Sequence, residues 1–284
     1  MSIVEEVMRR SAHERPVAMP GNVMPGPVPM QRVARPHNMG VLQPPPGAAP
    51  QDVFTPQHRV APVDPEALER NHVLLRVHDV AISRAYKILR TRVLRRLSAN
   101  NWATLGITGT AAGEGKSLTA VNLALALAQD VNTWVTLVDL DLQRPQLGSY
   151  LGMTYEHGLT DFLTGQVELD QIVYDIGVKR LSVIPNATSV ESSSELLSSP
   201  RMADFVNALE SQSPRRVVIY DMPPLMVTDD VLAFAPRVDS FLLVVSQGMT
   251  ARRTLANAKE VLSELNLMGV VLNRSTERND SPYY

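Results

Sequence analysis

A glycine-rich stretch that ends in Lys-Ser is the part of this sequence best suited to chemistry. It runs Gly109-Thr110-Ala111-Ala112-Gly113-Glu114-Gly115-Lys116-Ser117 and is followed by Leu118. Glycines allow a backbone to wrap closely around an anion with its N–H groups pointing inward. In such a loop the lysine reaches the β- and γ-phosphates of a nucleoside triphosphate, and the serine hydroxyl holds Mg²⁺. We therefore expect residues 113–118 to bind a nucleoside triphosphate.

The loop departs from the usual pattern at one position. The pattern G-x-x-x-x-G-K-[ST] has glycine where this chain has Thr110, and we expect Gly109 and Gly113 to supply the backbone freedom instead. The alternative is a glycine-rich turn that carries Lys-Ser by coincidence. The strand-like residues 105–108 and the helical residues 118–129 favour phosphate binding, because the helix aims its positive end at the anion.

Three aspartates stand at the ends of two apolar stretches. The first stretch ends Val138-Asp139-Leu140-Asp141, and the second ends Ile219-Tyr220-Asp221. The carboxyl ends of parallel strands line the ligand crevice beside a phosphate loop, so we expect these carboxylates to converge on the triphosphate. Mg²⁺ takes one or two carboxylates, and a remaining carboxylate can accept a proton from an attacking hydroxyl. The alternative is that Asp139 or Asp141 caps a turn and that Asp221 only satisfies loop amides.

From residue 103 the chain alternates between strand-like and helix-like stretches. Continuous apolar runs such as Val217-Val218-Ile219 are typical of strands buried on both faces of a parallel sheet. We predict an α/β domain of three layers, like a P-loop NTPase, with a mostly parallel central sheet. The predicted strands are 104–108, 134–140, 181–185, 216–221, 240–246 and 268–273, and the predicted helices include 194–210, 229–234 and 250–265.

Asn273 closes the last predicted strand. Its amide can read the edge of a nucleotide base, and the alternative is an ordinary turn residue.

Composition divides the chain into three parts. Thirteen of the 21 prolines precede Glu66, and proline excludes helices and central strands, so we expect residues 1–65 to be a disordered, proline-rich segment. Residues 66–275 are expected to form the folded domain, and 276–284 a flexible tail. The net charge of −2 gives no bulk attraction to nucleic acid, and the absence of cysteine excludes disulfides and thiolate metal sites.

A basic helix is predicted for residues 79–98, just before the first strand. Its basic side chains are Arg84, Lys87, Arg90, Arg92, Arg95 and Arg96. Two interpretations remain open, a solvated basic face or a contact with another subunit or an anionic membrane.

These motifs, in this order, resemble the bacterial protein tyrosine kinases (BY-kinases) of polysaccharide export systems, whose cytoplasmic domain is built on a P-loop ATPase core. The resemblance covers roughly residues 80–275. It is carried by Gly113-Glu114-Gly115-Lys116-Ser117, Asp139-Leu140-Asp141-Leu142-Gln143-Arg144-Pro145, Glu195-Leu196-Leu197-Ser198-Ser199-Pro200-Arg201, Asp221-Met222-Pro223-Pro224 and Gly269-Val270-Val271-Leu272-Asn273.

The resemblance implies a tyrosine autokinase that uses ATP and Mg²⁺ and regulates exopolysaccharide biosynthesis or export. It implies that Lys116 and Ser117 belong to a Walker A motif, and that Asp139 and Asp141 form a Walker A′ pair that helps to deprotonate the acceptor tyrosine. It implies that Asp221 is the Walker B acid beside Mg²⁺ and that Asn273 contacts adenine. The acceptor tyrosines in the tail would be Tyr283 and Tyr284. The metal set would be Ser117, Asp139 and Asp221.

The resemblance also implies a location and partners. We expect a cytoplasmic homo-oligomer, held beside the inner membrane by a separate membrane-bound polysaccharide co-polymerase that activates it. We expect no nucleic-acid partner.

Three positions depart from the family's pattern. Gln143 stands where the Walker A′ motif often has arginine, and Met222 where threonine is common. Arg84 replaces the acid of an oligomer-forming Glu-x-x-Arg-x-x-Arg motif. The alternative function is a non-kinase P-loop ATPase that acts as an ATP-gated assembly scaffold. The partitioning ATPases of that kind carry a signature lysine where this chain has Ala111, which argues against them.

Overall fold

The computed structural model describes residues 59–75, 79–211 and 216–275. The predictions for residues 1–58 and for the tail 276–284, with Tyr283 and Tyr284, lie outside the described residues.

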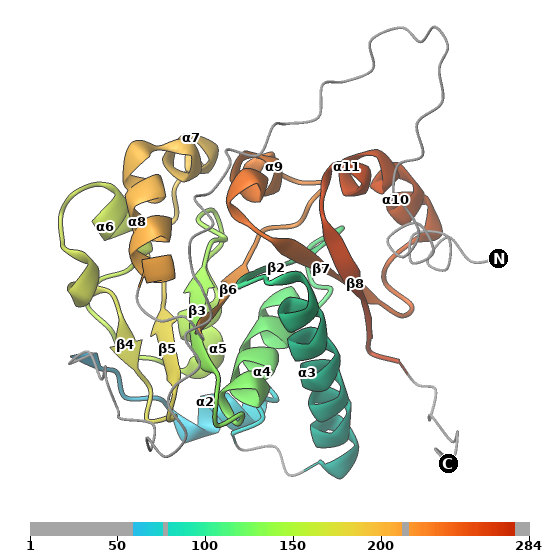
Figure 1. Cartoon of the computed structure of the whole chain (residues 1–284), viewed down its shortest axis with the longest axis horizontal. Coiled ribbons are helices and arrows are strands. Elements are labelled where there is room, and N and C mark those ends of the chain that lie inside the picture. Colours follow the sequence, from blue (N-terminus) through green and yellow to red (C-terminus); the bar gives the residue numbers. More distant parts are fainter. Residues whose placement is uncertain (1–58, 76–78, 212–215, 276–284) are drawn as a thin grey trace, which may run out of the picture.

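Within the described residues, an eight-stranded sheet forms the centre of the molecule (Figure 1). The strands lie in the order β1-β4-β5-β3-β6-β2-β7-β8, and neighbours run parallel except β4 and β5. The bounds are β1 (Arg59–Val60), β2 (Thr104–Gly109), β3 (Trp134–Asp139), β4 (Tyr174–Asp175), β5 (Leu181–Ile184), β6 (Arg216–Asp221), β7 (Ser240–Ser246) and β8 (Leu267–Asn273).

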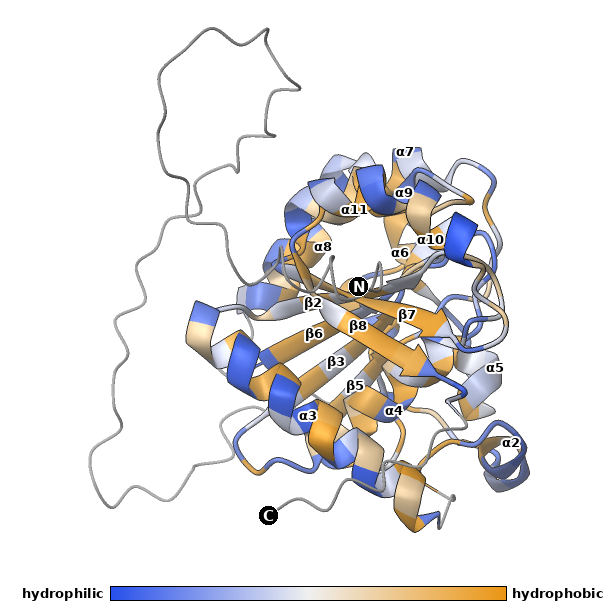
Figure 2. Cartoon of the chain, turned by 90° about the vertical axis from the view of Figure 1, so that its right-hand side faces the viewer, coloured by the Kyte–Doolittle hydropathy of each residue, from blue (hydrophilic) through white to orange (hydrophobic). Residues whose placement is uncertain are grey.

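Helices cover both faces of this sheet, so the predicted three-layer architecture with a mostly parallel sheet is confirmed (Figure 2). One face carries α2 (Pro65–Arg70), α3 (Val80–Asn100), α4 (Lys116–Ala128) and α5 (Leu147–Leu151). The other carries α6 (Leu159–Leu163), α7 (Ser193–Ser198), α8 (Pro200–Ser211), α9 (Asp230–Phe234), α10 (Arg252–Asn257) and α11 (Lys259–Glu264), with 3₁₀ turns at Leu169–Gln171 and Ala235–Arg237.

The apolar strands serve two hydrophobic cores. Successive side chains of a strand point to opposite faces, so Leu137 packs into the core beneath α3 and α4. Its neighbour Val138 packs into the core beneath α8 and α9. Both side chains are almost completely buried. This explains why the central strands are buried at nearly every position and carry continuous apolar runs instead of an alternating pattern.

Helix α4 is buried on nearly all sides. It contacts β2, β3 and β6 on one side and α3 on the other. Ala120 and Ala124 are fully buried, and small side chains of this kind let α4 approach its neighbours closely. The helix that begins at the phosphate loop is therefore held firmly by the protein interior.

Two predicted helices are interrupted. The helix predicted for 194–210 divides into α7 and α8, because Pro200 forces the preceding Ser199 into an extended conformation with ψ of 156°. The helix predicted for 250–265 divides into α10 and α11 at Ala258, whose ψ is −11°. The interruption leaves its apolar face intact, since Leu255, Ala258, Leu262 and Leu265 are all buried.

The sheet includes residues that the sequence predicts to be disordered. Residues 59–60 form β1, which pairs with the short strand β4, and the sequence analysis found neither strand. Two residues give too little alternation to signal a strand. Part of the segment expected to be disordered up to residue 65 therefore belongs to the sheet.

No helix among the described residues combines the length and the apolar character that crossing a membrane requires.

Candidate functional site

The glycine-rich loop connects β2 to α4, and three of its glycines are required by the geometry. Gly113 and Gly115 have φ values of 80° and 89°, in the left-handed region that favours glycine. At Gly109 a Cβ atom would lie only 2.4 Å from the Glu114 Oε2 atom. Thr110 has no positive φ, which explains why this loop accepts threonine where the usual pattern has glycine.

The Glu114 carboxylate is tied to the start of the loop. It is 1% exposed and accepts hydrogen bonds from the backbone N–H groups of Thr110 (2.6 Å) and Ala111 (3.0 Å). The hydroxyls of Thr110 (2.7 Å) and Thr250 (2.5 Å) also donate to it. The sequence predicts that Glu114 lies at the nucleotide. It does not identify Thr250, which is marked only by a hydroxyl group shortly after a strand. Glu114 thus joins the loop to the segment after β7.

The start of α4 is prepared for an anion. Gly115 is its N-cap residue, and no side chain hydrogen bond caps the helix there. The first N–H groups of a helix need acceptors, and a phosphate group can supply them. Lys116 and Ser117 lie in this first turn and are 7% and 8% exposed. The geometry of this helix start fits a bound phosphate group, and phosphate binding by Lys116 and Ser117 stays a prediction.

Asp139 and Asp221 lie side by side, as register partners at the ends of β3 and β6. Asp139 is fully buried, and its oxygens accept hydrogen bonds from the N–H groups of Asp141 (3.2 Å), Gln146 (3.0 Å) and Leu147 (3.0 Å). Burial, and then the charge of Asp221, raise the pKa of Asp139 well above its usual range. Asp139 therefore also caps the turn that starts α5, which was the alternative interpretation.

Asp221 is fully buried as well, but neither of its oxygens accepts a hydrogen bond from a described residue. Burial raises its pKa to about 7. The Ser117 hydroxyl and the Lys116 ammonium limit this rise, although the Ser117 contact falls outside hydrogen-bond geometry. An unsatisfied carboxylate beside a hydroxyl fits Mg²⁺, which prefers oxygen ligands. No group of three acidic or histidine side chains that could hold a metal occurs among the described residues, so phosphate oxygens would complete the site.

Asp141 differs from the other two acids because it is partly exposed. Its Oδ1 atom accepts a hydrogen bond from the backbone N–H of Arg144 (3.0 Å). Burial raises the pKa of Asp141, the Arg144 N–H and Lys116 lower it, and the charge of Asp230 adds to the rise. Asp141 is thus the carboxylate that a substrate hydroxyl can reach. Asp230 follows Asp221 by nine residues and belongs to no motif, so the sequence alone does not identify it.

Asn273 contacts the phosphate loop from the end of β8. Its Nδ2 atom donates a hydrogen bond to the Glu114 carbonyl oxygen (3.0 Å). A Cβ atom on Gly115 would lie 2.1 Å from the same Nδ2 atom. Asn273 therefore braces the loop, a role that its position after a strand did not reveal. Its predicted contact with adenine stays a prediction.

The structure brings most of the predicted residues to one edge of the sheet. Leu118 is the exception, since its side chain packs against the core and only its backbone can serve the site. The residues gathered at the carboxyl ends of the strands are Gly113, Glu114, Gly115, Lys116, Ser117, Asp139, Asp141, Asp221 and Asn273.

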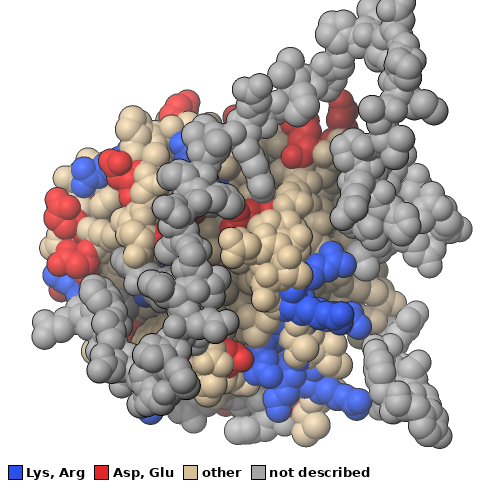
Figure 3. Space-filling view, in the orientation of Figure 1, with Lys and Arg blue, Asp and Glu red and all other residues tan. Residues whose placement is uncertain are grey.

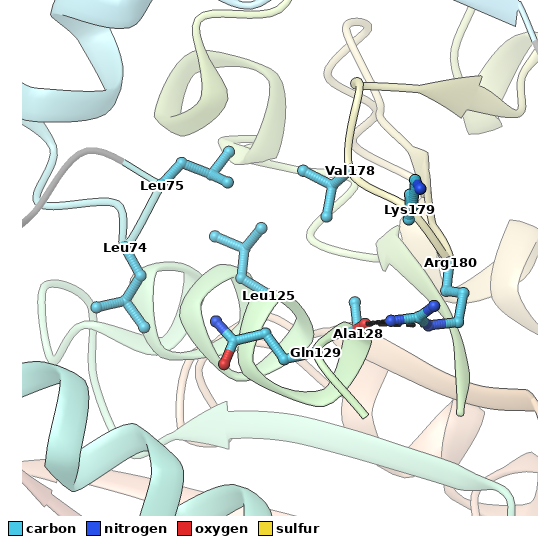
Figure 4. A pocket seen from close by; sticks show the side chains of 8 residues that line it. All are labelled: Leu74, Leu75, Leu125, Ala128, Gln129, Val178, Lys179 and Arg180. Atoms are coloured by element: carbon cyan, nitrogen blue, oxygen red, sulfur yellow. Dashed lines mark hydrogen bonds between the residues drawn. The ribbon is translucent and has the colours of Figure 1, made fainter. Parts of the chain in front are cut away.

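A shallow pocket of about 230 Å³ lies at the other end of α4 (Figure 4). Leu125 and Ala128 line it from the helix, together with Leu74, Val178 and Arg180. Arg180 donates two hydrogen bonds to the Ala128 carbonyl oxygen, at 3.3 and 3.0 Å. The pocket is therefore separate from the phosphate loop, and the Arg180 side chain that lines it already donates its hydrogen bonds to the protein backbone.

Comparison with known proteins places this site among nucleotide-binding proteins. Residues 105–283 match the family described as CobQ/CobB/MinD/ParA nucleotide binding domain. The chain is 30% identical over 218 residues to the tyrosine-protein kinase YwqD of Bacillus subtilis, covering 76% of this chain and 91% of that protein. It is 27% identical to the tyrosine-protein kinase etk of Escherichia coli, but it spans only 27% of that protein. The solved kinase domain of Escherichia coli ETK superposes with a TM-score of 0.66 at 25% identity, covering 80% of this chain and 86% of that domain.

The first prediction tests the contact between Gly115 and Asn273. In Gly115→Ala the new methyl group meets the Asn273 amide, so we expect the affinity for Mg·ATP to fall at least about tenfold, or about 1.4 kcal/mol. Gly177→Ala is the matched control, since its φ is 79° but nothing lies within 4 Å of its Cβ position. Titration calorimetry on both variants measures the difference. Equal affinities would contradict the proposed brace.

The second prediction concerns pH. The folded-state pKa of Asp221, about 7, lies above the value of about 3.9 usual in an unfolded chain, so the folded protein holds this proton more tightly. In the absence of Mg²⁺ and nucleotide, this group makes the free energy of unfolding decrease as pH rises from about 4 to about 7. Asp221→Asn should show a smaller decrease in denaturant titrations across this range. Identical slopes would refute the assignment.

Proposed function

Because the chain belongs to the CobQ/CobB/MinD/ParA nucleotide-binding family and to the bacterial tyrosine-protein kinases, we propose that it transfers the γ-phosphate of ATP to its own tyrosines with the aid of Mg²⁺. The observation that supports this most strongly is the meeting of three features at one sheet edge. They are the uncapped start of α4, the unsatisfied carboxylate of Asp221 and the reachable carboxylate of Asp141.

Binding and charge neutralisation would fall to the loop and the two buried acids. Lys116 and the first N–H groups of α4 would hold the β- and γ-phosphates. The oxygens of Ser117 and Asp221 would hold Mg²⁺, with Asp139 beside them. Bound Mg²⁺ would supply positive charge to the phosphate oxygens. Asn273 would keep the loop in place and contact adenine with its remaining amide capacity.

In the transfer step the tyrosine oxygen bonds to the γ-phosphorus while the bond from that phosphorus to the β–γ bridging oxygen breaks. ADP leaves, and the phenol proton passes to a carboxylate. Asp141 is suited to accept it, because it is the reachable acid and Lys116 lies close to it. A tyrosine pKa near 10 makes such assistance useful at neutral pH.

The acceptors we propose are Tyr283 and Tyr284, near the end of the chain given. The ten residues from 274 to 283 can span at most about 33–36 Å when fully extended. We propose that this length lets the tyrosines reach the site of the same chain or of a neighbouring one. Phosphate on both tyrosines would add roughly three to four negative charges to the tail.

The proposed setting is exopolysaccharide biosynthesis or export. The etk relative is almost four times as long as the matched region, so the further parts of that protein have no counterpart in the match. We propose that a separate membrane-bound polysaccharide co-polymerase supplies them and activates this chain at the cytoplasmic side of the inner membrane. We propose no nucleic-acid partner.

The proposed homo-oligomer would use α3. This helix has no acidic residue, and no carboxylate among the described residues forms an ion pair with it. Arg90 and Arg96 bond to the carbonyl oxygens of Ala126 and Met268. Other basic side chains of α3 remain exposed, and they gather over the helix in Figure 3. Such a surface can meet acidic side chains of another subunit.

The third prediction tests the kinase function in native cells, where the activating partner is present. Mass spectrometry of the purified protein should find phosphate on Tyr283 or Tyr284. Lys116→Met should abolish it, because the γ-phosphate loses its cationic partner. Replacing both tyrosines by phenylalanine should abolish the tail signal and leave ATP affinity unchanged.

If the tyrosines are unmodified in polymer-producing cells while ATP binding is intact, the proposed kinase function is wrong. The ATP-gated scaffold would then be the better account.

The fourth prediction tests α3. The double variant Arg84→Glu and Arg95→Glu reverses two exposed charges of the helix, so we expect the oligomer to dissociate at low salt. Lys179→Glu is the control, since Lys179 is an exposed base at the far end of α4. Light scattering gives the molar mass of each variant. An oligomer that survives in the double variant would exclude α3 as the interface.

A further inference from the structure

A buried chain of hydrogen bonds leads away from the loop that holds Asp141. Asp230, the first residue of α9, is fully buried, and the Ser193 Oγ atom lies 2.8 Å from each of its carboxylate oxygens. The Gln143 Nε2 atom donates to the same Ser193 Oγ atom at 2.9 Å. A serine hydroxyl has a single hydrogen, so here it accepts from Gln143 and donates to Asp230.

The same segment holds the Asp141 loop by its backbone as well. The Ser189 hydroxyl donates to the Gln143 carbonyl oxygen at 2.6 Å, and the Val190 N–H donates to the Leu142 carbonyl oxygen at 2.9 Å. Asp141 immediately precedes these two residues. Residues 189–193 therefore hold the loop that carries the Asp141 carboxylate, and Asp230 holds Ser193 of this segment in turn.

The chain of hydrogen bonds joins two of the strand exits that form the site. Gln143 follows β3, and Asp230 follows β6 beyond the Met-Pro-Pro turn. Ser193, at the start of α7, stands between them. The Asp141 loop is thus tied to the segment that follows Asp221 by side chains that belong to neither strand.

Stability alone does not favour a carboxylate at position 230. A buried charge without a cationic partner is destabilising, and no ion pair to Asp230 occurs among the described residues. Asp230 is joined through Ser193 to Gln143, two residues after Asp141. This buried carboxylate is therefore connected to the loop that carries the proposed proton acceptor.

We propose that Ser193 and Asp230 are positioning residues for phosphoryl transfer, which hold Asp141 where it can receive the proton of the acceptor tyrosine. This inference rests on the proposed kinase function. Misplacement of a reacting group by about 1 Å can slow a reaction about 100-fold, so two side chains outside the phosphate loop can control the transfer rate. They do so without touching the nucleotide.

The test uses the full chain in membrane fractions of its native cells, with γ-labelled ATP at saturating concentration. Ser193→Ala removes the central hydroxyl, and we expect phosphate incorporation into the tail to slow about 10- to 100-fold. Gln143→Ala breaks the chain at its partly exposed end and should give a similar loss with little risk to folding. The purified variants should bind a non-hydrolysable ATP analogue as tightly as the unchanged chain.

Ser193→Thr keeps the hydroxyl and should restore most of the rate. Asp230→Asn keeps an acceptor oxygen and removes the charge, so it should be faster than Ser193→Ala.

Three results would overturn the inference. One is an equal loss of rate in Ser193→Ala and Ser193→Thr, and another is a loss of analogue affinity that parallels the loss of rate. The third is an unchanged rate in both Ser193→Ala and Gln143→Ala. If the unchanged chain itself incorporates no phosphate, the kinase proposal fails first, so the two failures are distinguishable.

Discussion

Two carboxyl groups buried side by side, at the ends of β3 and β6, are the constraint on which the site depends. Asp139 and Asp221 are register partners, and burial raises the pKa of both. Three backbone N–H groups satisfy Asp139, whereas no described residue donates a hydrogen bond to Asp221. Asp221 therefore lies beside Lys116 and Ser117 as a carboxylate that no hydrogen bond from the described part of the chain stabilises. A cation bound to the phosphates would stabilise its charged form.

The phosphate loop itself is supported from two neighbouring strands. Glu114 reaches Thr250 after β7, and Asn273 reaches the Glu114 carbonyl oxygen from β8. These supports are hydrogen bonds between partly buried groups, so they fix the direction of the loop as well as its packing. The loop can thus keep its shape before the nucleotide arrives, which reduces the ordering that binding requires.

Local patterns in the sequence predict the central strands and the residues at the sheet edge. They do not predict the shortest strands or the interruption of a helix. Continuous apolar runs identified the central strands because both faces of the sheet are covered. Glycine spacing and the Asp-x-Asp pair identified the residues at the sheet edge. The two-residue strands β1 and β4 have no periodicity to detect, and Pro200 divides one helix at a point that the apolar pattern alone does not mark.

The missed residues are those that act through distant partners. Thr250 and Asp230 belong to no motif. Thr250 donates a hydrogen bond to Glu114, and Asp230 accepts one from Ser193, and both partners lie far away in the sequence. Only the folded chain brings these pairs together. For Asn273 the position was noted, but its bond to the loop backbone depends on β8 lying beside β7.

The strand order has a consequence for how the protein folds. β2, which carries the phosphate loop, pairs only with β6 and β7, strands that lie more than a hundred residues further along the chain. Contacts of such high sequence separation close slowly, because a long loop must be ordered first. During synthesis the nucleotide site therefore remains incomplete until the chain has emerged beyond β8, whose last residue, Asn273, contacts the loop. A bound nucleotide can then stabilise only a nearly finished domain, and it cannot assist the early steps of folding.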